Sequence, residues 1–234
     1  MGQRVRRLDQ LLGSLGYCSR KEAQGLCDEG RVTLDGQPLD DASRRVTPGL
    51  VRLDDVPLDF PDGLLVMVHK PVGLVCSHDS SEGPRVYDLL PPRWLHREPK
   101  VTTVGRLDKD TSGLLLVTDQ GALVQRFTSP RHHVDKTYLA TLDAEPAAAL
   151  IAAFAAGIDL KEGDAVERTL PATLKLLGDR RAEVTVREGR YHQVRRMFAA
   201  HGLHVVSLAR TRFGDFELGD LSPGAWRALP LTPQ

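Results

Sequence analysis

The first apolar pattern along the chain has the spacing of a helix. Leucines recur at positions i, i+3, i+4 and i+7 and form a single stripe, which Gly16 then interrupts. The residues of this stripe are Leu8, Leu11, Leu12 and Leu15. The pattern therefore predicts a short helix over residues 8–15.

A second short helix and a hairpin are predicted next. Ser19 and Glu22 have the spacing of a capping box, in which two side chains satisfy the free amides at the start of a helix. The apolar face that follows ends at Gly30. Residues 31–34 then alternate between polar and apolar before an Asp-Gly pair at 35–36, which favours a tight hairpin turn.

Residues 48–63 contain three prolines and several aspartates, which is typical of a final strand that runs into a connector. We therefore expect one domain over residues 1–60 and a second over residues 61–234. Beyond the connector, strand-like runs alternate with helical stretches, which predicts an α+β fold. The predicted strands are 64–69, 114–118, 137–142, 182–187 and 204–209, and the predicted helices are 122–127, 147–156 and 192–200.

The composition is that of an ordinary folded protein. The chain has 234 residues, of which 41% are hydrophobic and 26% charged, so it can bury a real core. Its 31 basic and 31 acidic residues balance, so any RNA site must be a local patch. The three cysteines have neither zinc-site spacing nor the pattern of a secreted disulfide framework. Because no signal segment or membrane-spanning stretch is visible, we expect a cytoplasmic protein.

The sequence lacks the signatures of several common enzyme classes. It contains no G-x-x-x-x-G-K-[ST], G-x-G-x-x-G, H-E-x-x-H or G-x-S-x-G motif, which argues against nucleotide hydrolysis, dinucleotide chemistry, zinc proteolysis and serine hydrolysis. His132 and His133 would point to opposite faces of a strand and would not both ligate one metal ion. We therefore expect a site with no metal and no cofactor.

An acidic loop is the first candidate for chemistry. Asp108 and Asp110 stand immediately before residues 111–113 and a strand that is predicted to be buried. A carboxylate at the mouth of such a strand is well held for use as a nucleophile or base. The same pattern also fits two aspartates that cap a turn, and spacing alone does not decide between these interpretations.

The N-terminal segment resembles the S4 RNA-binding domain. The resemblance is carried by the order helix, helix, hairpin and by the stretch RLDQLLGSLGYCSRKEAQGLCDEGRVTLDG. It implies RNA binding by the basic residues around it, although nearby acids also allow these side chains to form an ordinary solvated surface. The basic residues are Arg4, Arg6, Arg7, Arg20, Lys21 and Arg31.

The rest of the chain resembles the pseudouridine synthases of the RsuA and RluA group. The central motif of that group is similar to GRLDKDTSGLLLVTDQG, and three further segments follow the family order: MVHKPVGLVCS, SPRHHVDKTYLATL and EGRYHQVRRMFAAHG. The resemblance implies a mixed, mainly antiparallel sheet with flanking helices. It also implies isomerisation of a uridine in RNA without a cofactor.

Carried over by position, the resemblance assigns roles to individual residues. It makes Asp108 the catalytic aspartate, Tyr138 the residue that stacks on the target base, and Arg195 the partner of the aspartate. Val194 would line the uracil pocket, and Arg106 would fill the gap left by the extruded base. Lys70 and Lys136, which lie in two of the motifs, are also expected to bind substrate.

The motifs are most similar to the RsuA-type group, which includes RluB, RluE and RluF. This similarity favours uridine in 16S small-subunit ribosomal RNA, either naked or within a pre-ribosomal particle, and a protein that acts as a monomer. Three alternatives remain open: a synthase acting on 23S rRNA, a non-catalytic S4-type ribosome-assembly protein, and a hydrolase that uses Asp108 with Asp110.

Overall fold

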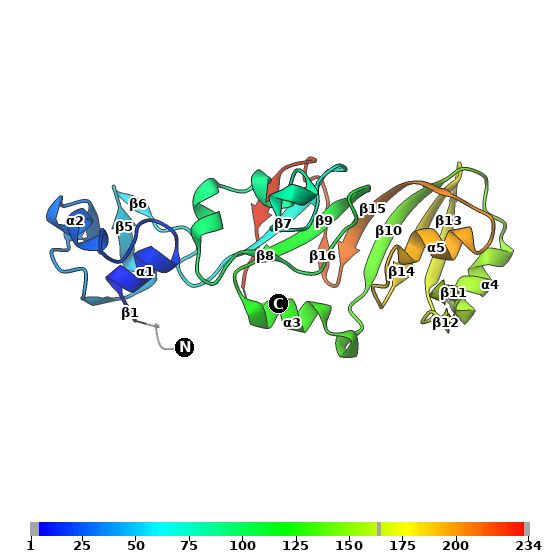
Figure 1. Ribbon diagram of the computed structural model, residues 1–234, viewed down its shortest axis with the longest axis horizontal. Coiled ribbons are helices and arrows are strands. Elements are labelled where there is room, and N and C mark those ends of the chain that lie inside the picture. The colour runs from blue at the N-terminus through cyan, green and yellow to red at the C-terminus, as the bar shows by residue number, and fades with distance from the viewer. Residues whose placement is uncertain (1–4, 163–164, 232–234) are drawn as a thin grey trace.

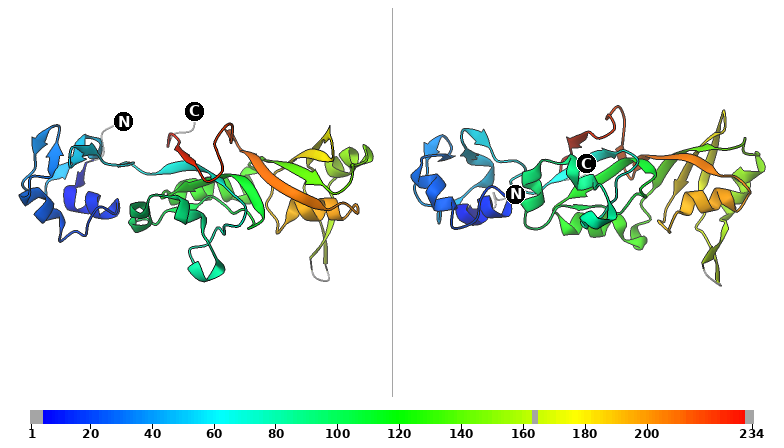
Figure 2. Two further views of the ribbon diagram at one scale, coloured as in Figure 1. Left: turned by 90° about the horizontal axis from the view of Figure 1, so that it is seen from above. Right: turned by 45° about the horizontal axis from the view of Figure 1, so that its top comes forward.

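The computed structural model describes residues 5–162 and 165–231. Figure 1 shows an elongated molecule, in which a small N-terminal module (blue) precedes the long sheet formed by the remaining chain. Figure 2 shows the same end-to-end arrangement from two other directions. In the two ranges described, no helix is both long and apolar enough to cross a membrane.

The N-terminal module begins with the two predicted helices, α1 (Leu8–Ser14) and α2 (Ala23–Asp28). The predicted capping box is present before α2. The Ser19 amide donates to the Glu22 carboxylate at 2.7 Å, and the Glu22 amide donates to the Ser19 hydroxyl at 3.3 Å. The leucine stripe of α1 is buried and forms the centre of the module's core, together with residues as far along the chain as Leu58.

Short strands complete this module. The predicted hairpin joins β2 (Val32–Leu34) to β3 (Gln37–Pro38), and Asp35 and Gly36 in its turn have φ angles of 50° and 77°. Residues 48–63 were expected to contain one strand and a connector. They contain instead the 3₁₀ helix η1 (Pro48–Leu50), β5 (Val51–Leu53) and β6 (Val56–Pro57). The sheet order is β3-β2-β5-β6, and β1 (Arg6–Arg7) pairs separately with β4 (Arg45–Val46).

The remaining chain is built on one long sheet, with the strand order β13-β14-β10-β15-β9-β7-β17. Two short strands lie beside this path, β16 against β15 and β8 against β9. The bounds are β7 (Leu65–Lys70), β8 (Thr102–Thr103), β9 (Thr111–Thr118), β10 (Lys136–Leu142), β13 (Thr173–Gly178), β14 (Arg181–Val186), β15 (Val205–Phe213), β16 (Phe216–Glu217) and β17 (Trp226–Ala228). All five strands predicted beyond residue 60 are therefore present.

The sheet is mixed because β15 runs parallel to β9, whereas every other pairing of described strands in it is antiparallel. This parallel pairing joins two halves with separate cores. Gly113 faces Arg210 across it, and a Cβ on Gly113 would lie 2.2 Å from the Arg210 carbonyl oxygen. Only glycine lets the two backbones approach this closely, so Gly113 holds the two halves together.

Helices cover the sheet on both sides of this junction. The longer ones are α3 (Gly121–Thr128), α4 (Ala149–Ala156) and α5 (Gln193–Ala199), as predicted. The α4 and α5 helices pack on one half, where the rings of Phe154 and Phe198 lie 5.0 Å apart. The hairpin of β11 (Asp159–Glu162) with β12 (Ala165–Arg168) lies beside them.

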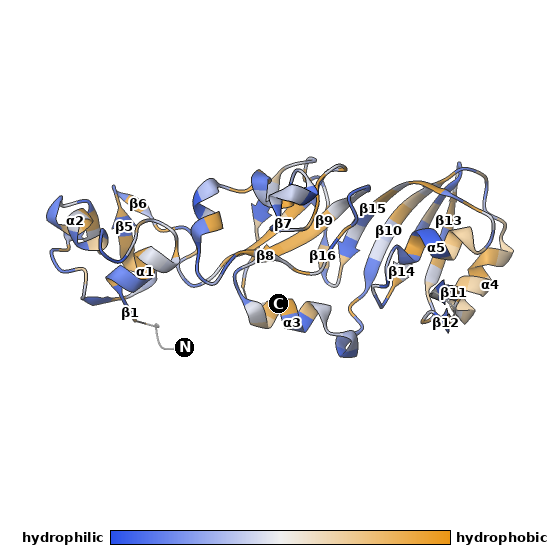
Figure 3. Ribbon diagram, viewed as in Figure 1, coloured by the Kyte–Doolittle hydropathy of each residue, from blue (hydrophilic) through white to orange (hydrophobic). Residues whose placement is uncertain are grey.

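Four short 3₁₀ helices occur in the connections of this sheet: η2 (Ser80–Glu82), η3 (Val86–Leu89), η4 (Pro92–His96) and η5 (Pro130–His132). Trp94 of η4 and Tyr87 of η3 pack against β7 and β9. In Figure 3 these two strands are orange along most of their length, as expected for strands with both faces buried.

The N-terminal module contacts η4, which packs on the half of the sheet that contains β7 and β9. The Arg93 guanidinium lies over the Tyr17 ring, 3.9 Å from its centroid, and also binds the Asp59 carboxylate. The Glu98 amide donates to the Ser14 carbonyl at 2.9 Å. The module is therefore attached to the sheet by polar contacts as well as by the connecting chain.

Candidate active site

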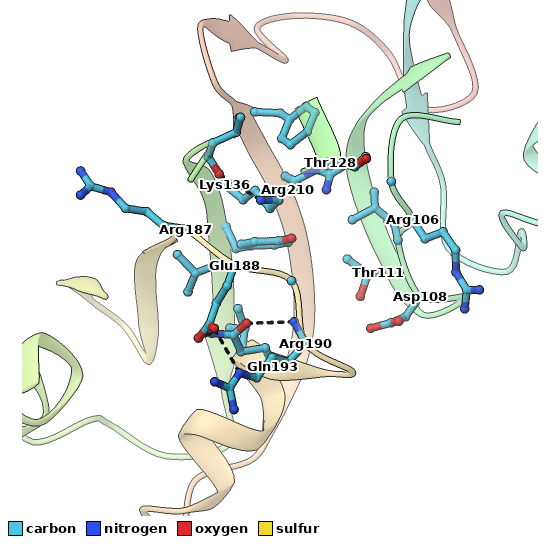
Figure 4. A pocket seen from close by; sticks show the side chains of 18 of the residues that line it. Arg106, Asp108, Thr111, Thr128, Lys136, Arg187, Glu188, Arg190, Gln193 and Arg210 are labelled. Atoms are coloured by element: carbon cyan, nitrogen blue, oxygen red, sulfur yellow. Dashed lines mark hydrogen bonds and ion pairs between the residues drawn. The ribbon is translucent and has the colours of Figure 1, made fainter. Parts of the chain in front are cut away.

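A pocket of about 690 Å³ opens where β10, β15 and β9 lie side by side. The sheet forms its floor, and the loop before β9, the end of α3 and the start of α5 form its walls. Figure 4 shows the side chains that these elements direct into it. The pocket contains residues from both halves of the sheet, so the parallel pairing of β9 with β15 creates it.

Asp108 lies in the loop between β8 and β9, at the wall of this pocket. Its side chain is 34% exposed, so it can reach a ligand in the pocket. Among the described residues, the basic group within 4 Å of its carboxylate is His192, whose Nε2 is 3.5 Å from Asp108 Oδ1. The carboxylate is thus held at an accessible position without being enclosed by basic side chains.

Lys70 holds the loop that carries Asp108 through hydrogen bonds to its backbone. Lys70 is 0% exposed, and its ammonium donates to the carbonyls of Thr111 at 2.7 Å and Asp108 at 2.9 Å. Burial lowers the pKa of Lys70, while the nearby Cys76 thiol and the carboxylates of Asp108 and Asp110 act in the opposite direction. The expectation that Lys70 contacts substrate is wrong for this structure, because its ammonium is buried and bound to backbone carbonyls.

Tyr138 and Lys136 reach the pocket from β10. Residues two apart on a strand point to the same face, which places both side chains on the pocket floor. Val194, which is 4% exposed, lines the pocket from the start of α5. The floor therefore provides a flat phenol ring and a basic group, and the α5 wall adds an apolar contact.

Arg195 projects from α5 but does not pair with Asp108 as expected. Its Nη2 lies 2.9 Å from Asp110 Oδ2, and its Nη1 donates to the Val205 carbonyl at 2.8 Å. Asp110, two residues further along the same loop, takes the place of Asp108 as the partner of this guanidinium. The Arg195 Nε atom is buried and has no hydrogen-bond partner among the described atoms.

The turn before α5 brings in residues that the motif analysis did not assign. Glu188 accepts hydrogen bonds from Gln193 at 2.8 Å and from Arg190 at 3.1 Å (Figure 4). His192 has a φ of 47°, and its ring stacks on that of Tyr191 at 3.9 Å. This network sets the shape of the turn and points His192 at Asp108. Residues 188–193 (EGRYHQ) belong to one of the family motifs, but their spacing in the sequence does not predict these contacts.

Arg106 is exposed at the rim of the pocket, beside Asp108 (Figure 4). It is therefore available to an RNA strand at the pocket mouth. The expected role of Arg106 in filling the gap left by an extruded base stays a prediction.

The basic residues expected to bind RNA in the N-terminal module have different surroundings. Arg7 pairs with Asp9 at 2.9 Å, Arg31 pairs with Asp54 at 2.7 Å, and Arg6 donates to the Ser14 hydroxyl at 2.8 Å. In contrast, Arg20 and Lys21 are exposed, and the ion pairs of the described residues include neither. Arg4 lies outside the described residues.

No cluster of three or more potential metal ligands of the types His, Cys, Asp and Glu occurs in the part of the chain that the structure describes. His132 ends η5 and His133 follows it with a φ of 44°, so these residues do not lie on a strand as expected. The His132 Nδ1 atom is 2.6 Å from the Arg126 carbonyl oxygen, which provides an ordinary structural contact for this ring.

Comparison with known proteins identifies the family. The family model described as RNA pseudouridylate synthase matches residues 64–200, and the S4 domain model matches residues 6–51. The chain belongs to the RNA pseudouridylate synthase family. The resemblances to this family and to the S4 domain are thereby confirmed, as is the α+β fold with a mixed sheet.

Several relatives in this family are similar over nearly their whole length. The ribosomal small subunit pseudouridine synthase A of Escherichia coli (strain K12) is 41% identical over 233 residues, which cover 97% of each chain. The protein of the same name from Pasteurella multocida (strain Pm70) is 37% identical over 95% of each chain. A crystal structure of a pseudouridylate synthase is 37% identical, covers 96% of each chain and superposes with a TM-score of 0.66.

Proposed function

We propose that this protein converts one uridine of 16S small-subunit ribosomal RNA to pseudouridine. The observation that carries the proposal is the position of Asp108, a partly exposed carboxylate in a pocket that Tyr138 and Arg195 also line. The choice of RNA is supported by the 41% identity, over 97% of each chain, to the ribosomal small subunit pseudouridine synthase A of Escherichia coli. The basic side chains of the S4 domain supply a second contact to the RNA.

The proposed reaction is an isomerisation that needs no redox partner. The bond between ribose C1′ and uracil N1 breaks, the base turns, and a bond between C1′ and C5 forms, while C5 loses a proton and N1 gains one. One carboxylate is sufficient for the essential step, by attack on C1′ or C6 or by removal of the 2′ hydrogen. Asp108 is assigned this role, and the three routes remain open.

The residues around Asp108 have separate proposed tasks. The glycosidic bond is inaccessible within stacked RNA, so the uridine must be turned out of its stack, and Arg106 at the rim can fill the gap. The Tyr138 ring can stack on the base, and its hydroxyl can accept the proton that leaves C5. Val194 provides the apolar contact for the ring. The proposed task of Arg195 is to hold the loop that carries Asp108, and to place a positive charge beside it, through its ion pair with Asp110.

The first experiment identifies the reaction and the RNA. Pseudouridines are mapped chemically in 16S and 23S rRNA from cells with and without the gene for this protein. We expect one 16S uridine to remain unmodified in the deletion strain and to be restored by the wild-type protein, but not by Asp108→Asn. Loss of a 23S site instead would assign the protein to the large subunit. No change in either RNA would favour the non-catalytic assembly role.

The same assay in vitro tests the assignment of the carboxylate. Asp108→Asn should lower turnover by more than about 1,000-fold while the protein stays folded and binds RNA. If Asp108→Asn kept substantial turnover while Asp110→Asn did not, the assignment of Asp108 would be wrong. Activity lost after dialysis against a chelator, and restored by zinc but not by magnesium, would contradict the proposal that the site needs no metal.

We further propose that the protein acts as a cytoplasmic monomer and that its substrate is 16S rRNA, either free or within a pre-ribosomal particle. Comparing activity on protein-free 16S rRNA and on partly assembled small subunits would distinguish the two forms of substrate. Sedimentation of the purified protein would test whether it is a monomer.

A further inference from the structure

A buried cation with no acidic partner forms part of the pocket floor. Arg210 of β15 is 2% exposed, its Nε donates to the Leu114 carbonyl at 2.8 Å, and its Nη2 is buried without a hydrogen-bond partner. The guanidinium packs over the Phe213 ring, 4.8 Å from its centroid. An arginine is always charged, so burial in this state carries a cost that an anion would offset.

A second cation lies beside it. Lys136 is partly buried on the neighbouring strand, and its ammonium lies 5.6 Å from the centroid of the same Phe213 ring. The Lys136 ammonium donates at 2.9 Å to the Val134 carbonyl, which is neutral. Burial lowers the pKa of Lys136, and the neighbouring charge of Arg210 lowers it further. The two groups therefore repel each other where water is partly excluded.

The nearest acids do not neutralise this pair of cations. Among the described residues, neither Lys136 nor Arg210 forms an ion pair. Asp135, next to Lys136 in the chain, binds Arg187 at 2.9 Å. Glu188 binds Arg190 at 3.1 Å, as Figure 4 shows. Each of these two carboxylates is already paired with another arginine.

We propose that Lys136 and Arg210 form a phosphate site, which holds a backbone phosphate next to the extruded uridine. This inference rests on the proposed function, because it takes RNA to be the ligand of the pocket. The uracil ring is neutral, so the phosphodiesters are the anions that such a ligand supplies. Two adjacent cations with a free Nη2 donor match the charge and the acceptor oxygens of a phosphate.

The arrangement of the pocket supports this role. Figure 4 places Lys136 and Arg210 beside each other on the strands, with Asp108 on the facing loop. A phosphate bound on the strands would anchor the backbone while the sugar and base extend towards Asp108 and Tyr138. The phosphate site would thus orient the glycosidic bond without taking part in bond breaking. Lys136 and Arg210 are positioning residues in this proposal.

The test removes one charge from the protein and one from the RNA. The RNA is a synthetic hairpin around the uridine that mapping has identified, with an uncharged methylphosphonate in place of the phosphate on its 5′ or 3′ side. The protein variant is Lys136→Gln, because Arg210 is so deeply buried that its loss could unfold the sheet. The matched control is Lys175→Gln, which removes an exposed lysine from β13 at the far edge of the same sheet.

We expect one of the two methylphosphonates to weaken binding to the wild-type protein by about tenfold, as for a lost charge-assisted hydrogen bond. Lys136→Gln should weaken binding of the normal RNA by a similar factor and show no further loss with that methylphosphonate. Lys136→Arg should restore the sensitivity, and Lys175→Gln should behave like the wild type. Circular dichroism spectra of the variants check that each is folded.

Two results would overturn the phosphate site. The first is that neither methylphosphonate affects binding. The second is that the loss of affinity from Lys136→Gln and the loss from the methylphosphonate multiply. Multiplied losses are expected if Lys136 makes a separate contact, for example with a uracil carbonyl. Either result leaves the proposed reaction intact, provided that the hairpin is still modified. Absence of modification in every rRNA would instead contradict the proposed function itself.

Discussion

Arg195 of α5 forms an ion pair with Asp110 of the loop before β9, and this pair joins the two halves of the sheet. The Arg195 Nη2 atom lies 2.9 Å from Asp110 Oδ2 and also donates to the Asp110 carbonyl at 3.2 Å. Arg195 belongs to the half covered by α5, and Asp110 belongs to the loop before β9. The pair thus fixes the loop that carries Asp108 relative to the rest of the site.

The first prediction concerns this pair. The Asp110 side chain is 62% exposed, so Asp110→Asn should change the free energy of unfolding by less than about 1 kcal/mol. Turnover should fall by about 10-fold to about 100-fold, because a small displacement of a catalytic group is costly. Single-turnover rates and urea unfolding measure the two effects. An unchanged rate would show that the pair does not position the loop.

The second prediction concerns the close approach of β9 to β15. Gly113→Ala places a Cβ against the Arg210 backbone at a φ of 107°, so we expect a loss of about 3 kcal/mol or more in the free energy of unfolding. Gly121→Ala is the matched control, since a Cβ at this position in α3 meets no atom within 4 Å. Its effect should stay within about 1 kcal/mol. Equal effects of the two variants would contradict the role given to Gly113.

The sequence was most informative where local rules decide the structure. The leucine stripe of α1, the capping box at Ser19 and the Asp-Gly turn each depend on residues that are close in the chain. The apolar runs that became β7, β9 and β10 were equally clear. Strands β13 and β17 were not predicted, because most residues of β13 are exposed or only partly buried and β17 has only three residues.

The site was harder to predict because it depends on contacts between distant segments. The pairing of Gly113 with Arg210 joins residues 97 positions apart, and periodicity contains no information about it. The burial of Lys70 and the pairing of Arg195 with Asp110 follow from that same arrangement. The resemblance assigned the acidic loop and the α5 segment to one site, and both line the pocket, but the Arg195 partner that it implied, Asp108, differs from the observed partner, Asp110.

The third prediction tests the lowered pKa of Lys136. A bound phosphate favours the charged form, so the pKa of Lys136 in the RNA complex lies above its value in the free protein. The affinity for RNA should therefore be fully present at a pH below the pKa of Lys136 in the free protein. It should fall as the pH rises through that pKa. Binding is measured from about pH 8 up to about pH 10, below the ordinary lysine value.

Lys136→Arg is the control for this pH series, because an arginine stays charged throughout. Over this range the wild type should lose more affinity than this variant. Titration of the RNA bases affects both proteins equally and cancels in the comparison. Parallel pH curves for the two proteins would exclude Lys136 as a phosphate ligand.

The last prediction separates the basic residues of the S4 domain. Arg20 and Lys21 are exposed, whereas Arg7 and Arg31 are held in ion pairs with Asp9 and Asp54. The double variant Arg20→Gln/Lys21→Gln should therefore bind RNA less tightly and with a flatter salt dependence than Arg7→Gln/Arg31→Gln, which removes the same total charge.

Each lost phosphate contact lowers the slope of log affinity against log salt by about 0.7 to about 0.9, so two contacts give a readily measured change. Single-turnover rates at saturating protein should stay close to the wild-type rate, because every proposed catalytic residue lies beyond residue 100 in another part of the fold. A salt series of binding measurements with both double variants provides the comparison. If Arg20→Gln/Lys21→Gln kept the wild-type slope, these side chains would be the ordinary solvated surface that the balanced net charge of the chain also allows.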